Sequence, residues 1–285
     1  MERYTITHFN NDFPNDDACL EWLKNNLYPD GIFCKKCGKV TKHHRIISRH
    51  SYSCDICGHH VHPTAGTIFE KSTTPLKLWF HAIYLMSSTR CGISAKQIER
   101  ETGVTYKTAW RMFKQIRSML EENHNNMSGP VEADETYIGG KRHGKRGRGA
   151  EGKTPIVGIV QRKGKLIATA TSNVKATTLL PIIKEHVLPD AVIYTDELPS
   201  YNKLPFMGYV HHQVHHALKI YAMGDIHTNT IEGFWSLLKR GISGVYHSVS
   251  AKYLQTYLNE YTFRYNHRKD ETPMFKTILA RIAIS

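Results

Sequence analysis

Four of the six cysteines have the spacing of a structural zinc site. They form two Cys-x-x-Cys pairs, Cys34/Cys37 and Cys54/Cys57, with 16 residues between the pairs. Two such pairs can place four thiolates around one tetrahedral Zn²⁺, which leaves no open position for catalysis. Disulfide bonds are the alternative, but the N-terminal residues lack the basic and apolar pattern of a secretion signal. The pattern therefore predicts a zinc ribbon, in which the metal helps a small domain to fold.

Three carboxylates in the second half of the chain are candidates for a different kind of metal site. Asp134 lies in a short apolar run (VEADETY), and Asp196 ends another (AVIYTD). Glu232 lies where apolar residues recur at helical spacing, so we expect it on an amphipathic helix. Each acid alone is a weak signal, because a strand-end Asp can cap a turn and Asn229-x-x-Glu232 is also a helix-capping pattern. Together they offer the oxygen ligands that hard divalent ions such as Mg²⁺ take.

The neighbours of these acids carry predictions of their own. Glu132 and Glu135 flank Asp134, and strand alternation is expected to turn both to the opposite side, so we leave them out of the site. Asn229 lies one turn before Glu232 and could contact metal or DNA. Two basic residues further along the same segment are expected to hold phosphate: Lys239 and Arg240.

The densest positive charge directly follows the first acidic run. Residues 139–153 (GGKRHGKRGRGAEGK) contain six Lys or Arg, six Gly and one Glu. Glycine and like charge together disfavour a packed element, so we expect a loop. A solvated loop kept for solubility is the plainer interpretation, but its place beside the acids favours phosphate binding. The DNA-binding candidates in it are Lys141, Arg142, Lys145, Arg146 and Arg148.

Residues 67–122 have the pattern of a helix-turn-helix. Residues 75–90 read as a mostly apolar helix, a capping pattern at Ser94 starts a second helix, and Gly103 ends it. Apolar residues at spacings of three or four mark a third helix over 109–120. An ordinary helical hairpin is the alternative, but the adjacent zinc ribbon and the basic charge favour DNA reading. The candidates for base or phosphate contacts lie at the start of the third helix: Tyr106, Lys107, Thr108 and Arg111.

The second half of the chain has the pattern of an α/β domain. A polar stretch with Gly and Pro, residues 123–130, is expected to be a linker. Residues 176–187 are helical by their apolar spacing, and Lys163-Gly164 is a hairpin signal. Runs rich in β-branched or apolar residues predict strands that form one sheet with the helix: 131–137, 154–161, 165–171 and 191–195.

Together, these motifs resemble those of one family. Two strand aspartates separated by 61 residues, and a helical glutamate after 35 more, resemble the DDE triad of transposases and retroviral integrases. The local words VEADETYIGGK, YTDELPSY and HTNTIEGFWSLLKRGISGVYH resemble bacterial insertion-sequence transposases with an N-terminal zinc ribbon, relatives of the Merlin superfamily. The cysteine pairs and the later EYTFRYNHR match as well, so the resemblance covers nearly the whole chain.

The resemblance implies an RNase H-like catalytic domain that uses two Mg²⁺ or Mn²⁺ ions. Asp134 would bridge the ions, with Asp196 on one and Glu232 on the other. Water would first free a 3′-OH at the element end, and this 3′-OH would then attack target DNA. The chain would thus be a DDE-type DNA transposase, a polynucleotidyl transferase and endonuclease. The alternatives are a domesticated or inactive transposase that acts as a sequence-specific DNA-binding regulator, and an RNase H-like nuclease acting on RNA or junctions.

The charge of the chain favours a polyanionic partner. Its 285 residues include 38 Lys and Arg against 25 Asp and Glu, a formal net charge of +13. The resemblance implies double-stranded DNA, both the terminal inverted repeats and the target, and a homodimer or larger synaptic assembly. No apolar run approaches the roughly 20 residues of a membrane span, so we expect a cytoplasmic, nucleoid-associated bacterial protein.

The expected organisation has an α/β RNase H-like catalytic domain preceded by a zinc ribbon and a helix-turn-helix. Its four parts are an N-terminal helix and zinc ribbon (1–66), a helix-turn-helix region (67–122), a linker (123–130) and the catalytic domain (131–285).

Overall fold

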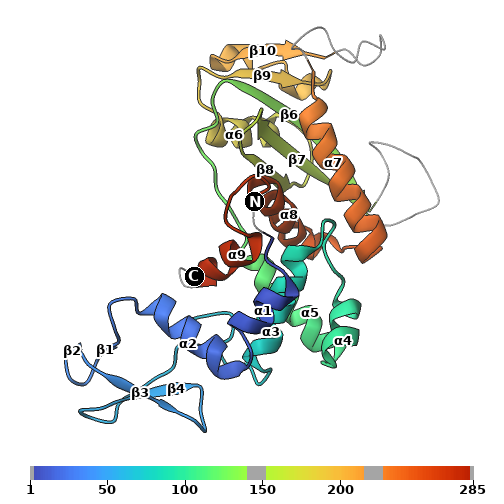
Figure 1. Ribbon diagram of the computed structural model, residues 1–285. Coiled ribbons are helices and arrows are strands. Elements are labelled where there is room, and N and C mark those ends of the chain that lie inside the picture. Colours follow the sequence, from blue (N-terminus) through green and yellow to red (C-terminus); the bar gives the residue numbers. More distant parts are fainter. Residues whose placement is uncertain (1–2, 140–151, 215–226, 283–285) are drawn as a thin grey trace. The chain divides into compact units, whose positions relative to one another are not determined.

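The computed structural model describes residues 3–139, 152–214 and 227–282 (Figure 1). The chain forms two compact units, the first comprising Met1–Met119 with Asp270–Ser285 and the second Leu120–Lys269. The expected catalytic domain ran to residue 285, whereas the structure groups the last helix, α9 (Met274–Ile282), with the first unit. The physical reason is aromatic packing, because the Phe275 ring lies 4.8 Å from that of Tyr4.

The first unit contains a β-ribbon built from very short strands. A hairpin of two strands precedes a three-stranded antiparallel sheet. Strands of this length bury little apolar surface, so we expect this part of the unit to depend on its cysteine cluster. The strands are β1 (Phe33–Cys34), β2 (Lys39–Val40), β3 (His43–Ile46), β4 (Ser51–Cys54) and β5 (His60–Val61).

Helices with an aromatic core form the rest of the first unit. The buried rings of Phe9, Phe13 and Phe80 pack on one another, with the Phe13 and Phe80 centroids 4.9 Å apart. The Asp16 carboxylate accepts the backbone N–H groups of Leu76 and Lys77, which ties one helix to the start of another. Besides α9, these helices are α1 (Ile6–Asp12), α2 (Asp16–Leu27), α3 (Leu76–Ser88), α4 (Ala95–Thr102) and α5 (Tyr106–Ser118).

The three helices predicted between residues 75 and 120 are confirmed as α3, α4 and α5. The Ser94 hydroxyl accepts the N–H of Gln97 at the start of α4, and Gly103, at φ +72°, ends that helix. Thr105 caps α5 in the same way as Ser94 caps α4. Both α4 and α3 pack against α5. Whether these helices read DNA stays a prediction.

A five-stranded mixed sheet forms the centre of the second unit. The strand order is β10-β9-β6-β7-β8; β7 is antiparallel to β6 and to β8, whereas β9 is parallel to β6 and to β10 (Figure 1). The four predicted strands are confirmed, and a fifth, β10, was not predicted. The strands are β6 (Pro130–Gly139), β7 (Lys153–Gln161), β8 (Leu166–Ala170), β9 (Val192–Thr195) and β10 (Val210–Gln213).

Helices cover both faces of this sheet. The predicted helix is confirmed as α6 (Ala176–His186), which packs over one apolar face together with the short 3₁₀ turn η1 (Pro199–Tyr201). The other face carries α7 (Asn229–Gly241), which packs on β6 and β7, and α8 (Ala251–Asn266), which packs on β8. Alternation along β6 therefore sends successive side chains toward α6 and toward α7.

A close contact fixes the end of α7 against α8. A Cβ atom at Gly241 would lie 1.6 Å from the Tyr261 hydroxyl oxygen, so a larger residue cannot occupy this position without displacing the tyrosine. One π-helical turn over Ile242–Tyr246 follows directly. Among the described residues, no helix combines the length and apolarity that a bilayer crossing requires.

Candidate metal centre on the sheet

The acidic site forms where two parallel strands, β6 and β9, lie side by side. Their register pairs Glu132 with Tyr194, and Asp134 and Asp196 each lie two residues further along. One oxygen each of Asp134, Glu135 and Asp196 lie within 4.8 Å of one another. The sheet thus brings together two of the predicted acids, together with a third that we had left out.

Glu135 faces the other side of the strand, as predicted, yet its carboxylate reaches this group. Its Oε2 accepts a hydrogen bond from the Tyr201 hydroxyl at 3.2 Å. Burial raises the pKa of Tyr201 well above its ordinary value, so this hydroxyl stays a donor. The sequence shows Glu135 only as a neighbour of Asp134, and strand alternation alone gave no reason to include it.

Asp134 lies in surroundings that disfavour its charge. Burial raises its pKa to about 6, and the charges of Asp196 and Glu232 act in the same direction. A hydrogen bond from Trp235 opposes the shift. A divalent cation would relieve this repulsion, because it offsets the negative charges that are brought together here.

Trp235 links α7 to Asp134 through a hydrogen bond and through close packing of its indole on the sheet. Its Nε1 donates to Asp134 Oδ2 at 2.9 Å. The indole packs over Gly158, the residue that pairs with Asp134 on β7, where a Cβ atom would lie 2.6 Å from ring atoms Cζ2 and Cη2. Glycine at 158 therefore gives the indole the room to reach the carboxylate.

Asp196 and Glu232 each have a local partner besides the acidic site. Asp196 Oδ1 accepts the N–H of Leu198, so the turn-capping role considered for a strand-end Asp is present as well. Thr228 Oγ1 donates to Glu232 Oε1 at 2.9 Å. Glu232 is exposed on α7, and its charge acts on Asp134, but within the described residues it is not part of the group of oxygens within 4.8 Å.

The first turn of α7 does not form the helix cap that the Asn229-x-x-Glu232 pattern offered as an alternative. The residue that precedes the helix is Thr228, so Asn229 is not the cap and the Asn229 capping box does not form. Asn229 is exposed, as are Lys239 and Arg240 near the end of the helix. Nothing in the described structure holds these side chains in the core, which leaves them available to a ligand.

The predicted orientation of Glu132 is wrong, whereas its exclusion from the group of metal ligands is not contradicted. This residue lies two positions before Asp134 and therefore shares its face of β6, the face covered by α7. Its side chain is fully buried and accepts hydrogen bonds from the N–H groups of Thr230 and Ile231. Because residues two apart on a strand share a face, strand alternation applied correctly places Glu132 on the same face as Asp134. Its hydrogen-bond partners could not be predicted in this way, because they lie almost 100 residues away in the sequence.

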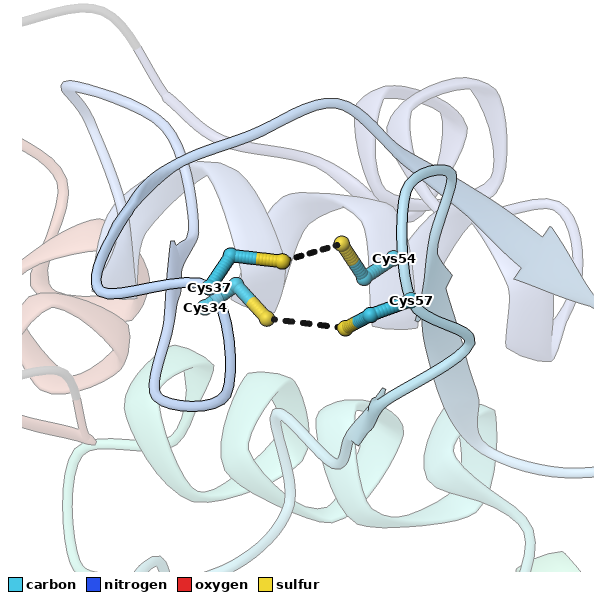
Figure 2. A group of neighbouring side chains, drawn as sticks. All are labelled: Cys34, Cys37, Cys54 and Cys57. Atoms are coloured by element: carbon cyan, nitrogen blue, oxygen red, sulfur yellow. Dashed lines mark hydrogen bonds between the residues drawn. The ribbon is translucent and has the colours of Figure 1, made fainter.

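The four predicted zinc ligands lie together in the β-ribbon of the first unit. Figure 2 shows their sulfur atoms facing one another, with Cys34 and Cys57 3.5 Å apart and Cys37 and Cys54 3.9 Å apart. A tetrahedral Zn–S distance of about 2.3 Å places sulfur atoms about 3.8 Å apart, so the cluster fits such an ion. The Thr41 hydroxyl lies 3.2 Å from Cys54 Sγ and lowers the pKa of that thiol to about 5.

The cysteine pairs have the same backbone turn. Gly38 and Gly58 each donate a backbone hydrogen bond to the first cysteine of their pair, at 2.9 Å. Both glycines have φ near +70°, a conformation that other residues rarely adopt. These two turns aim the thiolates at a common centre.

The predicted DNA-binding residues fall into three groups. Tyr106, Lys107 and Arg111 are exposed on the first turns of α5, and Thr108, beside them, is half-buried. Asn229, Lys239 and Arg240 lie on α7 of the second unit. The third group lies outside the described residues: Lys141, Arg142, Lys145, Arg146 and Arg148.

Comparison with known proteins places the chain in a family. Residues 126–266 match the ISXO2-like transposase domain, and residues 14–60 match the transposase zinc-ribbon domain. An uncharacterized protein in transposable element ISH50 of Halobacterium salinarum is 30% identical over 94% of this chain and 97% of its own length. The chain belongs to the IS1595 family of insertion-sequence transposases.

The matched regions of this IS1595-family chain contain both candidate metal sites. The transposase domain spans the sheet with α6, α7 and α8, and the ribbon match includes all four cysteines. An uncharacterized transposase-like protein of Haemophilus influenzae is 32% identical over 37% of this chain and 84% of its own length.

Two solved structures show weak similarity to the chain. A chain of a simian T-cell lymphotropic virus intasome aligns with 67% of this chain and 74% of its own, at 16% identity and a TM-score of 0.31. A chain of a pre-cleavage Mos1 transpososome aligns with 72% and 78%, at 11% identity and a TM-score of 0.27. Neither similarity supports a conclusion about this chain.

Proposed function

We propose that this IS1595-family chain cleaves DNA at the ends of its insertion sequence and joins the freed 3′-OH to target DNA. The observation that carries the proposal is the meeting of Asp134 and Asp196 on neighbouring parallel strands, beneath the helix that bears Glu232. An RNase H-like fold for the second unit is part of the proposal. Its support is a sheet with β6 in the middle, antiparallel strands on one side and parallel strands on the other.

Asp134, Asp196 and Glu232 would hold two divalent ions, Mg²⁺ or Mn²⁺. Bound there, the ions would supply activation of the attacking oxygen and stabilisation of the leaving one. The residues of the chain do the positioning: Trp235 holds one oxygen of Asp134, and the Leu198 N–H holds one of Asp196. Glu135, joined to Tyr201, adds negative charge beside the same place.

The cationic side chains of α7 would hold the DNA backbone. Lys239 and Arg240 lie two helical turns beyond Glu232, about 10–12 Å along the helix. Asn229 lies one turn before Glu232 and could contact metal or DNA. We assign the basic segment with Lys141, Arg142, Lys145, Arg146 and Arg148 to phosphate binding from its charge alone.

The first unit would recognise the ends of the element. The four cysteines would hold one structural Zn²⁺, which their sulfur spacing fits. In this proposal α4 and α5 act as a helix-turn-helix. The start of α5 would contact bases and phosphates through Tyr106, Lys107, Thr108 and Arg111.

The partners follow from the reaction. The substrates would be the terminal inverted repeats and the target duplex, which would place the protein at the nucleoid. Two element ends cut together need at least two active sites, so we propose a homodimer or larger assembly. The similarity to one protein in a transposable element and to one transposase-like protein supports the same substrate class.

A panel of substrates tests the proposed function. Duplexes that carry the terminal repeats, scrambled duplexes of equal length and RNA–DNA hybrids would be incubated with the full chain and Mg²⁺. We expect nicking at the repeat ends and joining to a second duplex. Sequence-specific binding without nicking at any Mg²⁺ or Mn²⁺ concentration would indicate a regulator, and preferential cutting of the hybrid would indicate a nuclease; either outcome contradicts the proposal.

A further inference from the structure

We propose that Glu132 is a positioning residue that fixes the start of α7, and with it Asn229 and Glu232, over the metal centre. This inference rests on the function proposed above. Its basis is geometric: a fully buried carboxylate with both oxygens engaged by the segment that carries the third acid.

The carboxylate of Glu132 caps α7 from the sheet. Its Oε2 accepts the backbone N–H groups of Thr230 and Ile231, at 2.9 and 3.0 Å, and its Oε1 accepts the Thr230 hydroxyl at 2.9 Å. The first N–H groups of a helix have no partner within the helix, so an acceptor here satisfies them. The negative charge also lies at the positive end of the helix dipole.

Arg162 also holds the Glu132 carboxylate. We call the contacts of Glu132 with Thr230, Ile231 and Arg162 the anchor of α7. The Nε of Arg162 donates to Glu132 Oε1 at 2.8 Å, and its Nη2 donates to the His227 carbonyl oxygen at 2.7 Å. The guanidinium also lies over the Tyr194 ring, 4.3 Å from its centroid. Arg162 thus joins the end of β7 to β9 and to the segment that enters α7.

These contacts argue against Glu132 as a metal ligand itself. Each of its oxygens already accepts hydrogen bonds of 3.0 Å or less, and it is not among the carboxylates whose oxygens gather within 4.8 Å. A buried carboxylate without such partners would be costly, so the pairing also explains how the charge is tolerated.

Two residues of β6, Glu132 and Asp134, each hold α7, and their spacing along the strand matches the spacing of their partners along the helix. Glu132 and Asp134 are two residues apart on the same face of β6, a separation of about 6.6 Å. Their partners on α7, Thr230 with Ile231 and then Trp235, are four to five residues apart, about 6–7.5 Å along a helix. A shift of α7 that frees Glu132 would therefore also move Trp235 and Glu232 relative to Asp134.

The test compares Glu132→Gln and Thr230→Val with a control, Glu185→Gln, on the exposed side of α6. Glu132→Gln keeps the size of the side chain but replaces one acceptor oxygen by a donor. Thr230→Val removes only the hydroxyl donor, so it serves if the Glu132→Gln protein does not fold. Mn²⁺ binding is measured by paramagnetic resonance, and cleavage is measured as a function of Mn²⁺ concentration with equal amounts of folded protein.

We expect the half-saturating Mn²⁺ concentration to rise about tenfold or more in Glu132→Gln and about threefold in Thr230→Val, because residues that orient ligands tune metal affinity. The rate at saturating Mn²⁺ should fall much less. An unchanged half-saturating concentration in Glu132→Gln, at equal folded protein, would overturn the proposal, since a merely structural role lowers only the folded fraction.

Amide exchange separates a failure of this inference from a failure of the proposed function. If the wild-type chain neither binds Mn²⁺ nor cleaves DNA, the proposed function fails. The N–H groups of Thr230 and Ile231 still report on the anchor: faster exchange in Glu132→Gln than in Glu185→Gln supports it, and equal exchange overturns it.

Discussion

At the residue scale, the ionised Asp134 carboxylate lowers the stability of the folded chain when no metal ion is bound. Its ionised form is disfavoured by burial and by Asp196. Because its pKa in the folded chain is raised above the ordinary Asp value, its protonated form contributes stability at low pH. That contribution is lost as the pH rises through about 6.

Replacing Asp134 with Asn tests this electrostatic cost. Without added Mg²⁺ or Mn²⁺, Asp134→Asn should increase the free energy of unfolding at pH 7.5 by up to about 3 kcal/mol. Below about pH 3 the variant and the wild type should have equal stability, because Asp134 is then protonated in both the folded and the unfolded state. Urea unfolding at several pH values measures the difference.

The control is Asp190→Asn, at an exposed position of the same unit. It should show no such gain at neutral pH. A less stable Asp134→Asn protein at pH 7.5 would mean that the ionised carboxylate is stabilised by its surroundings, contrary to the account.

Sequence patterns predicted the main acids of the site but not the side chains that support them. Both aspartates follow from apolar runs that predict strands: Asp134 lies within one run, and Asp196 ends the other. The anchor at Glu132 depends on Thr230 and Ile231, and a pairing across such a distance leaves no local pattern. Strand periodicity assigns Glu135 to the face opposite Asp134, so it does not predict that a Glu135 oxygen lies within 4.8 Å of those of Asp134 and Asp196.

At the scale of elements, the contact between α7 and β7 determines how closely the helix approaches the sheet. Gly158→Ala would place a Cβ atom 2.6 Å from the Trp235 ring and 2.8 Å from Ile231 Cδ1. Such overpacking is expected to destabilise the second unit by about 1–3 kcal/mol and to displace the indole from Asp134. Denaturant unfolding followed by tryptophan fluorescence measures both effects.

A glycine on α7 itself gives a control of opposite sign. Gly233 is exposed, and a Cβ atom placed there meets no other atom of the described residues within 4 Å, apart from its chain neighbours and the backbone of its own helix. Gly233→Ala should therefore stabilise the unit by about 0.5–1 kcal/mol through helix propensity. Equal stability changes in the two variants would contradict the role assigned to the Gly158 contact.

If α5 contacts DNA as proposed, the DNA affinity of the chain should depend on salt concentration through the basic residues of this helix. Lys107 is exposed in the first turn of α5. If it neutralises one phosphate, Lys107→Ala should make the slope of log affinity against log salt shallower by about 0.9. Binding titrations between low and moderate salt measure the slope, with Lys184→Ala on α6 as the control; an unchanged slope for Lys107→Ala would count against α5 as the contact.

At the scale of the molecule, two units with different means of stabilisation share one chain. The sheet of the second unit has apolar clusters on both faces, whereas the β-ribbon has short strands and four clustered cysteines. The sequence indicated both kinds of region. It did not predict that α9 belongs to the first unit, because the contact between Tyr4 and Phe275 joins opposite ends of the chain.

Removal of zinc should separate these two means of stabilisation. Chelation is expected to remove amide protection from residues 33–61, because structural zinc contributes about 10–16 kcal/mol of apparent binding free energy in small domains. Protection in the second unit should persist. Hydrogen exchange with and without chelator measures this, and loss of protection throughout the sheet β6–β10 on mild chelation would contradict it.

The most direct test of the central claim is metal-dependent cleavage of a duplex that carries the terminal repeats. The wild type, Asp134→Asn, Asp196→Asn, Glu232→Gln and the Asp190→Asn control would be compared at equal DNA occupancy in Mg²⁺. We predict that each triad variant loses about a thousandfold or more in cleavage rate while the control retains the wild-type rate, because the bound ions stabilise the transition state by several kcal/mol. Wild-type cleavage by any one of the three triad variants would contradict the assigned site.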